Sequence, residues 1–238
     1  MLKSIKVVIL MLTISFNASG MESDDPYVFV KDVASATFAK MKQDQAIIKK
    51  DPQVLRQIVE QQLMPHIDHT YAALSVLGTQ AKDIPREKLD QFFEQFRLYL
   101  LTTYSGSLSS YTDQIVEFEP SRPIENKKIV SVKGTIKEAG KPDISITFQV
   151  RRNKENQWKA FDLVAEGISM VQSKRAESAP IIRQEGIDTV IDRQLVVVVT
   201  ARGVTLIEDL IANLCGLNST AHDMAEGLYL ATGETHTI

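Results

Sequence analysis

The sequence predicts an α+β domain, in which helices pack on one face of a curved antiparallel sheet of about four strands. Two changes in the spacing of apolar residues carry this prediction. From residue 25 to residue 113 the apolar positions follow the period of a helix. Between Tyr111 and Leu163 they alternate with polar positions, as in half-buried strands, and after Ser169 the helical pattern returns. The chain is therefore expected to run from helices through a sheet to helices again.

Start and stop signals divide the first half into several helices. Asp51 before Pro52 predicts a helix N-terminus, because aspartate caps the first turn and proline fits its first position. Further helices are expected from Thr70 to Leu77 and from Pro85 onward. The last is the longest, and its apolar stripe is broader than one packing partner requires. The stripe consists of Leu89, Phe92, Phe93, Phe96, Leu100 and Tyr104, widened by Leu98, Tyr99 and Leu101.

Alternating segments define the predicted sheet. A turn at residues 139–142 joins the first two long strands, and another strand starts at Trp158, so an antiparallel meander is the simplest connection. The Trp158 strand carries apolar side chains on both faces and breaks at Glu166-Gly167. Ser169 and Gln172 then form a capping box that starts a helix, and a further helical piece is expected around residues 180–185. The apolar residues on one face of the two long strands are Val130, Val132, Ile136, Ile144, Ile146, Phe148 and Val150.

Residues 1–20 have the pattern of a secretory signal peptide. Lys3 and Lys6 precede a short apolar stretch, and small residues follow up to an expected cut after Gly20. Removing these two lysines from 27 basic residues leaves 25 against 30 acidic ones, a net charge of −5. Because no basic surplus remains to neutralise phosphates, we expect no nucleic acid as a partner. Cys215 is the single cysteine, so stability must come from a hydrophobic core and not from an intramolecular disulfide.

The stretch PHIDHTY suggests a metal site. His66 and His69 could share a helical face with Asp68 between them, but no further ligands stand at a recognisable spacing. The alternative, which we prefer, is that Asp68 caps the helix resuming at Thr70 and that both histidines face solvent. We therefore expect no metal.

Carboxylates on or beside the strands are the candidates for catalysis. Asp162, flanked by Phe161 and Leu163, is the sharpest of them, because a cup-shaped fold can use one buried carboxylate as a general base. The others are Glu117, Glu119 and Glu166. Serines are plentiful, but the sequence contains no G-x-S-x-G elbow and no glycine-rich phosphate loop. An enzyme acting on a small apolar substrate is thus the alternative to a binding protein, and an adaptor that only contacts other proteins is a third possibility.

The surplus of apolar surface points to a hollow interior. The wide stripe, the sheet face and the strand from Trp158 to Val164 together offer more apolar side chains than one packed interface needs. A cavity between helices and sheet, filled by an apolar guest, would account for the surplus.

Several motifs, taken in order, resemble one known family. They are DPY at Asp25, LMPHIDHTYAALSVLG, FFEQFRLYLLTTY, WKAFDLVAEGISMV from Trp158, and GID at Gly186. The chain resembles the periplasmic phospholipid-binding proteins of the toluene-tolerance family (MlaC-like proteins of the Mla lipid-transport pathway) over about residues 25–194.

The resemblance implies a phospholipid carrier in the periplasm of a Gram-negative cell. Such a carrier moves lipid between an outer-membrane lipoprotein complex and an inner-membrane MCE-type ABC transporter, and so maintains outer-membrane lipid asymmetry. The implied fold is a cone of the nuclear-transport-factor type with an apolar cavity. The implied protein is a monomer without catalysis, and phospholipid is its cargo in place of a cofactor.

The spacing of the apolar residues, which places them on the faces of helices and strands expected to meet inside the domain, selects the residues expected to line the lipid tails. They come from the long helix, the sheet and the segment after the strand break, and are Phe96, Leu100, Tyr104, Val132, Ile146, Phe148, Ile168, Met170 and Val171.

The C-terminal part, residues 195–238, departs from the family pattern. It contains the run Val196 to Val199, which has high strand propensity, and a segment with helical spacing that Thr205 can cap. Three interpretations stay open: an extension that packs on the domain, a segment that contacts a partner, or the product of a shifted reading frame. The expected division is therefore a signal peptide at 1–20, a phospholipid-binding domain at 21–194 and an atypical extension at 195–238.

Overall fold

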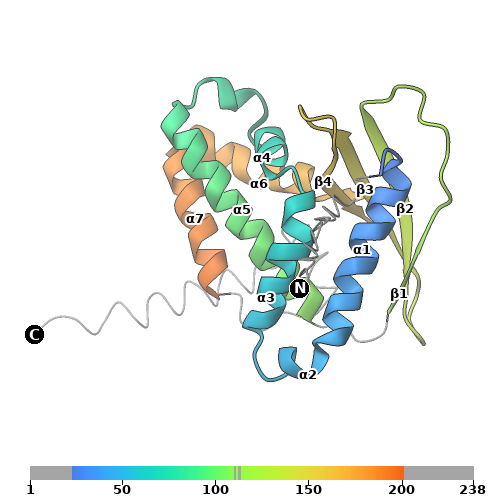
Figure 1. The fold of residues 1–238 in the computed structure, drawn as a ribbon. Helices are drawn as coiled ribbons and strands as arrows, with labels where there is room; N and C mark the ends of the chain where they lie inside the picture. Colours follow the sequence, from blue (N-terminus) through green and yellow to red (C-terminus); the bar gives the residue numbers. More distant parts are fainter. Residues whose placement is uncertain (1–22, 110, 112–113, 201–238) are drawn as a thin grey trace, which may run out of the picture.

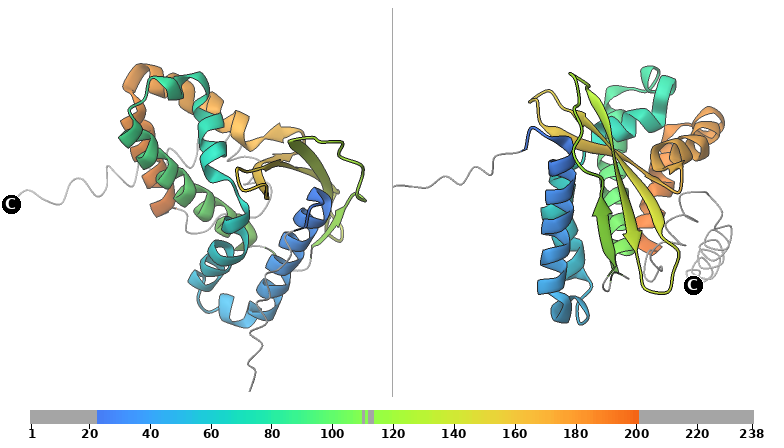
Figure 2. Two further views of the ribbon diagram at one scale, coloured as in Figure 1. Left: turned by 45° about the horizontal axis from the view of Figure 1, so that its top comes forward. Right: turned by 90° about the vertical axis from the view of Figure 1, so that its right-hand side faces the viewer.

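The helices lie on one side of a five-stranded antiparallel sheet (Figures 1 and 2). The computed structural model describes residues 23–109, 111 and 114–200, with side chains as far as Arg193. The predicted α+β class is confirmed, with one strand more than the four expected. The predicted signal peptide and residues 201–238 lie outside the described residues.

The helices before the sheet begin where the sequence places capping residues. The Asp25 carboxylate accepts a hydrogen bond from the Tyr27 amide at 2.8 Å, and Asp51 accepts one from the Gln53 amide at 3.0 Å. Asp68 likewise caps the fourth helix through the Tyr71 amide at 3.0 Å, as predicted. These elements are α1 (Pro26–Gln43), α2 (Gln45–Ile48), α3 (Gln53–Ile58), the π-helical turn η1 (Val59–Leu63), η2 (Met64–His66), α4 (His69–Leu77), η3 (Gly78–Lys82) and α5 (Arg86–Ser109).

The sheet is a meander in sequence order. Its strands are β1 (Ile115–Phe118), β2 (Ile129–Lys137), β3 (Ile144–Arg152), β4 (Trp158–Ala165) and β5 (Ile168–Ser169). Val132 lies opposite Phe148 across β2 and β3, so the predicted apolar face is formed. The fifth strand exists because Glu166 and Gly167, with φ of 49° and 82°, reverse the chain so that β5 pairs back onto β4.

Two helices follow the sheet, α6 (Met170–Glu185) and α7 (Ile187–Thr200). The prediction of a separate helical piece from Pro180 is wrong, because α6 runs through Pro180 without interruption while it packs on α4. The run Val196 to Val199 belongs to α7 and not to a strand. Buried Val190 and Ile191 anchor this helix to the core, and tertiary packing of this kind overrides strand propensity.

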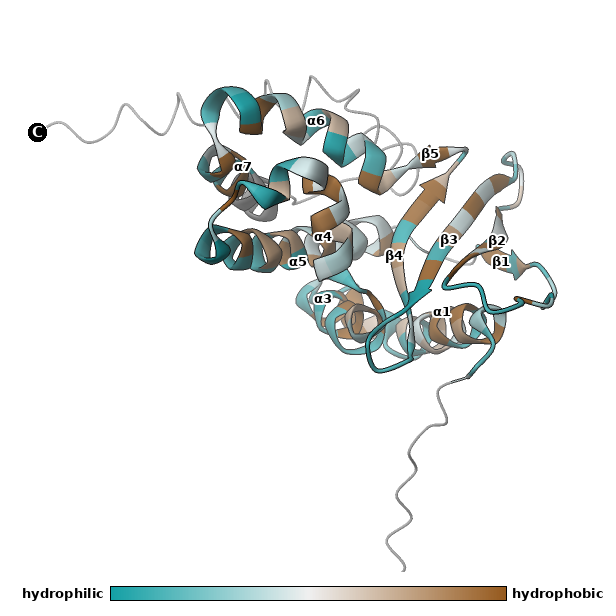
Figure 3. Ribbon diagram, turned by 90° about the horizontal axis from the view of Figure 1, so that it is seen from above, coloured by the Kyte–Doolittle hydropathy of each residue, from teal (hydrophilic) through white to brown (hydrophobic). Residues whose placement is uncertain are grey.

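The interior consists of two hydrophobic clusters. The larger lies among α3, α4, α5, α6 and α7 and contains Phe92, Phe96, Leu77 and Val171. The smaller lies between α1 and the sheet, and it contains Phe29, Val132 and Trp158. Figure 3 shows apolar stretches along β3 and β4 and on the helices that face them.

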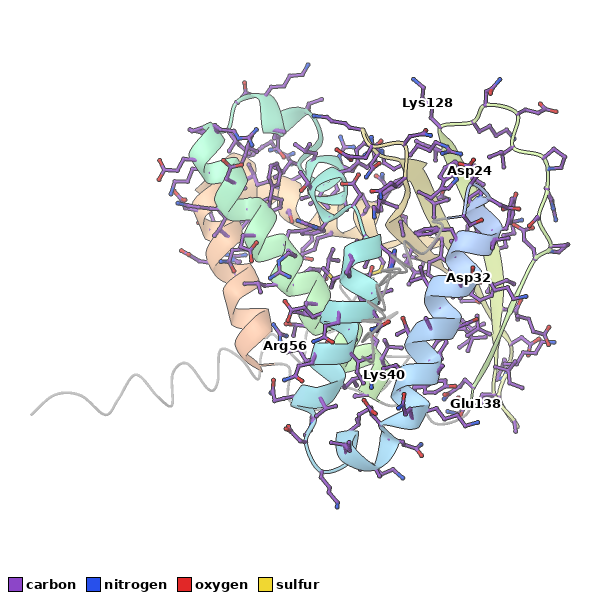
Figure 4. All side chains as sticks on the ribbon, in the orientation of Figure 1. Asp24, Asp32, Lys40, Arg56, Lys128 and Glu138 are labelled. Atoms are coloured by element: carbon purple, nitrogen blue, oxygen red, sulfur yellow. The ribbon has the colours of Figure 1, made fainter. Side chains whose placement is uncertain are left out.

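Trp158 also ties the start of the described chain to the sheet. Its indole N–H donates to the Asp24 carbonyl at 2.8 Å, and Arg152 forms an ion pair with the Asp24 carboxylate at 3.1 Å. Figure 4 shows Asp24 and Lys128 at the same end of the molecule. Within the described residues, no helix combines the length and apolar character needed to cross a membrane.

Candidate functional site: an apolar cavity beside β4

A small cavity lies where β4 meets α5 and the beginning of α6. Its volume is about 20 Å³, within about 350 Å³ of space between atoms that also includes the open mouth. The smaller volume is the space that the centre of a water molecule can occupy. It corresponds to about one water molecule. The cavity is lined by Ile67, Ala72, Phe96, Tyr99, Leu100, Tyr104, Phe161, Asp162, Leu163, Met170, Val171 and Lys174.

The structure brings five of the nine predicted tail-lining residues to this cavity. They are Phe96, Leu100 and Tyr104 from α5, and Met170 and Val171 from α6. Phe96, Leu100 and Tyr104 share one face of α5, because residues four apart lie one above the other on a helix, whereas Met170 and Val171 are the first two residues of α6.

The four remaining predicted residues lie elsewhere. Val132 and Phe148 belong to the cluster under α1, and Ile146 is buried on the same sheet face beside Gly134. Ile168 lies half-buried in β5. The two groups are separated because β4 stands between the α1 cluster and the helices that form the cavity.

A β-bulge accounts for Phe161, a lining residue of β4 that the sequence pattern did not select. The register between β3 and β4 shifts at Gln149/Val150, and Phe161 is the extra residue. Its ring meets Tyr71 of α4 edge to face at 5.0 Å. The apolar side chains on both faces of this strand were the available signal, but no local pattern gives the position of a bulge.

Asp162 fastens β4 to the start of α6. One carboxylate oxygen accepts the Ser169 hydroxyl at 2.5 Å, and the other accepts the Val171 amide at 3.0 Å. Burial raises the pKa of Asp162, although the hydrogen bonds from Ser169 and Val171 oppose that shift. Because both oxygens are engaged in holding the helix, the carboxylate is placed as a capping group.

Tyr104 brings a buried hydroxyl to the cavity wall. Its oxygen lies 4.0 Å from the Met170 sulfur, a weak acceptor. Burial raises the pKa of Tyr104 strongly, and the nearby Asp162 and Tyr99 raise it further. The hydroxyl therefore stays protonated and neutral.

The predicted PHIDHTY cluster has a structural role in the fold. Asp68 forms an ion pair with Arg151 of β3, whose guanidinium stacks 4.1 Å from the Tyr71 ring centre. His66 packs against the Phe29 ring at 5.7 Å. His69 is half-buried, so the prediction that both histidines face solvent is wrong. Across the part of the chain that the structure describes, no three histidine, cysteine or carboxylate side chains gather as a metal site would require.

Comparison with known proteins adds sequence and structural relatives. The family model described as MlaC protein matches residues 31–194. The intermembrane phospholipid transport system binding protein MlaC of Haemophilus influenzae is 31% identical over 170 residues, which cover 71% of this chain and 79% of that protein. Toluene tolerance protein ttg2D of Pseudomonas putida is 20% identical over 182 residues, which cover 76% and 83%.

A solved structure shares the fold. The phospholipid-binding protein from Ralstonia solanacearum, determined in complex with a phospholipid, superposes with a TM-score of 0.67 at 21% identity. The match covers 74% of this chain and 98% of that one.

Proposed function

Because the chain belongs to the MlaC family, we propose that it binds a phospholipid and carries it through the periplasm. Its proposed partners are an outer-membrane lipoprotein complex and an inner-membrane MCE-type ABC transporter. We propose that it acts after removal of the signal peptide, as a monomer and without catalysis. The observation that carries this proposal is the family match, which spans every residue that lines the cavity.

The chemistry of the cavity wall suits acyl chains. Eight of the twelve lining residues have wholly apolar side chains, which need no hydrogen-bond partner and can pack directly against a hydrocarbon chain. Burying each CH₂ group gains about 0.8 kcal/mol, so two tails of roughly fifteen carbons gain on the order of 20 kcal/mol on leaving water. An apolar enclosure removes most of the barrier to carrying a lipid between membranes.

Loading requires the cavity to widen, because about 20 Å³ holds no acyl chain. The wall that we propose to move is the start of α6. It carries Met170 and Val171, and it follows the tight turn at Gly167. Asp162 holds it through the two hydrogen bonds that accept from Ser169 and Val171. The turn would act as the hinge and Asp162 as the latch.

Organic extraction of the purified chain tests the proposal directly. We expect mass spectrometry to find diacyl phospholipid at close to one molecule per chain. An enzyme without cargo would yield no lipid, and its turnover would fall on changing Asp162.

Tryptophan substitutions test which residues the tails reach. Leu100→Trp would fill the cavity, and Ile146→Trp and Phe148→Trp would fill the predicted tail region on the sheet. We expect each to lower lipid recovery several-fold, whereas Ile129→Trp, at a position 46% exposed, serves as the control. Unchanged recovery in a variant would remove that residue from the proposed site.

A further inference from the structure

One positively charged side chain lies on the wall of the apolar cavity. Lys174 of α6 is the only basic residue among the described residues that line it. Its side chain is 13% exposed, so most of the carbon stem is packed inside the protein. A lysine so placed offers an apolar stem to the cavity and a charge at its end.

The ammonium group lies between the cavity and the solvent. It forms an ion pair with Glu177 at 2.9 Å, and the Glu177 side chain is 51% exposed. On the other side it lies 4.7 Å from the centre of the Tyr99 ring, and Tyr99 also lines the cavity. Burial lowers the pKa of Lys174, but Tyr99 and Glu177 outweigh that effect, so the net pKa is raised and the charge is retained. The structure thus holds a positive charge at the border of an apolar space.

A phospholipid carries its negative charge at the same kind of border. The phosphodiester stands where the acyl chains end, so tails in the cavity would bring the phosphate to its rim. Lysine binds phosphate as a point charge through its three N–H donors. Phosphate can replace Glu177 because the ammonium group then keeps an anionic partner, and the freed carboxylate, on a side chain 51% exposed, returns to water.

We propose that Lys174 binds the phosphate of the lipid and exchanges Glu177 for it when the cavity is loaded. This inference rests on the proposed function and assigns to it a residue that distinguishes phospholipid from uncharged diacylglycerol. Glu177 acts as a stand-in that neutralises the ammonium while the site is empty. Release would reverse the exchange, with the carboxylate displacing the departing phosphate.

A competition between two lipids with the same tails tests the exchange. The delipidated full chain is incubated with equal amounts of dioleoyl phosphatidic acid and dioleoylglycerol, and the bound lipids are extracted and counted. We expect the wild type to retain the phosphate-bearing lipid preferentially. Lys174→Met keeps an unbranched apolar side chain in the wall, and it should lower the ratio of bound phosphatidic acid to diacylglycerol by about tenfold, or about 1.4 kcal/mol.

Three further variants keep the test decisive. Lys174→Arg should retain most of the preference, and Glu177→Gln should raise it, because the competing carboxylate is gone. Lys40→Gln removes a helical ion pair of the same 2.9 Å length on α1, and it should leave the ratio unchanged. If the Met variant does not fold, the Arg and Gln variants still decide.

The outcomes separate this inference from the function on which it rests. A chain that captures neither lipid overturns the carrier proposal itself. A chain that captures both lipids, with a ratio insensitive to Lys174 and Glu177, overturns the phosphate assignment alone. An equal fall in the ratio with Lys40→Gln would show a general effect of net charge and would also overturn it.

Discussion

Replacing Asp162 by alanine should loosen the start of α6, which forms one wall of the cavity. The change leaves the Val171 amide, a donor on a buried residue, without an acceptor. An unsatisfied buried donor costs about 1–3 kcal/mol. The half-buried Ser169 hydroxyl can turn to water while it still caps Gln172. We therefore expect a loss of about 2 kcal/mol in the free energy of unfolding, which for a domain of this size lowers Tm by roughly 4–8 °C.

Asp162→Asn is the matched comparison, because it preserves the shape and one acceptor oxygen. Its oxygen can still accept from Val171, and its amide can donate to the Ser169 hydroxyl. At neutral pH we expect this variant to stay within about 1 kcal/mol of the wild type. Hydrogen exchange should show faster exchange at Val171 and Gln172 in the alanine variant only. Equal stability and equal exchange in all three proteins would refute the assignment of Asp162 as a latch.

The difference in stability between Asp162→Asn and the wild type should depend on pH, because the pKa of Asp162 is raised. A carboxyl group whose pKa is higher in the folded than in the unfolded state stabilises the fold. This stabilisation is at its full size only when the pH is below the ordinary pKa of 3.8. That contribution is lost as the pH rises through the folded pKa. Relative to the wild type, Asp162→Asn should therefore gain stability as the pH is raised from below 3.8 toward neutral. Denaturant unfolding across this range measures the difference, and an opposite trend would contradict the burial argument.

Gly78→Ala should cost about 1–3 kcal/mol, because Gly78 has a φ of 57° and a Cβ there would meet the Arg175 guanidinium at 2.6 Å. Gly140→Ala, with φ of 79° and no atom within 4 Å, should cost less in the same thermal unfolding assay. Burial, followed by the charge of Arg97, lowers the pKa of His69, so the folded state resists protonation. Stability should fall as the pH drops below 6.5, and His69→Gln should reduce that fall in denaturant unfolding. Tyr104→Phe removes a hydroxyl whose hydrogen-bond partner within the described residues is the Met170 sulfur, a weak acceptor, so Tm should change little.

The elements that could be predicted from sequence are those specified by local chemistry. Asp51, Asp68 and Ser169 cap helices where the sequence placed them, since a cap depends on residues two or three positions away. The alternation in β2 and β3 fixed both the strands and the face that Val132 and Phe148 share. Pro180 misled the prediction, because the packing that keeps α6 continuous comes from α4, about a hundred residues earlier.

The five cavity-lining residues that the sequence pattern selected all lie on helices, and none lies on β4. Phe96 and Tyr104 share a helical face that periodicity reveals, but the direction of Phe161 depends on a bulge. Lys174 was missed for a different reason. A lysine in the second turn of an amphipathic helix is usually solvated, whereas tertiary packing leaves the Lys174 side chain 13% exposed and places its ammonium group 4.7 Å from the ring centre of Tyr99 in α5.

The small cavity and the proposed cargo are reconciled by comparing energies. Transfer of two acyl chains from water gains on the order of 20 kcal/mol. Freeing the start of α6 breaks the bonds from Ser169 and Val171 to Asp162, at about 1–3 kcal/mol each. In the proposed loading, lipid contacts would replace the apolar contacts that Met170 and Val171 lose on moving, so the net cost of opening would stay well below the gain. Without lipid, the apolar side chains of the cavity wall pack on one another and so stay out of contact with water. A large cavity would therefore be needed only while a lipid is bound.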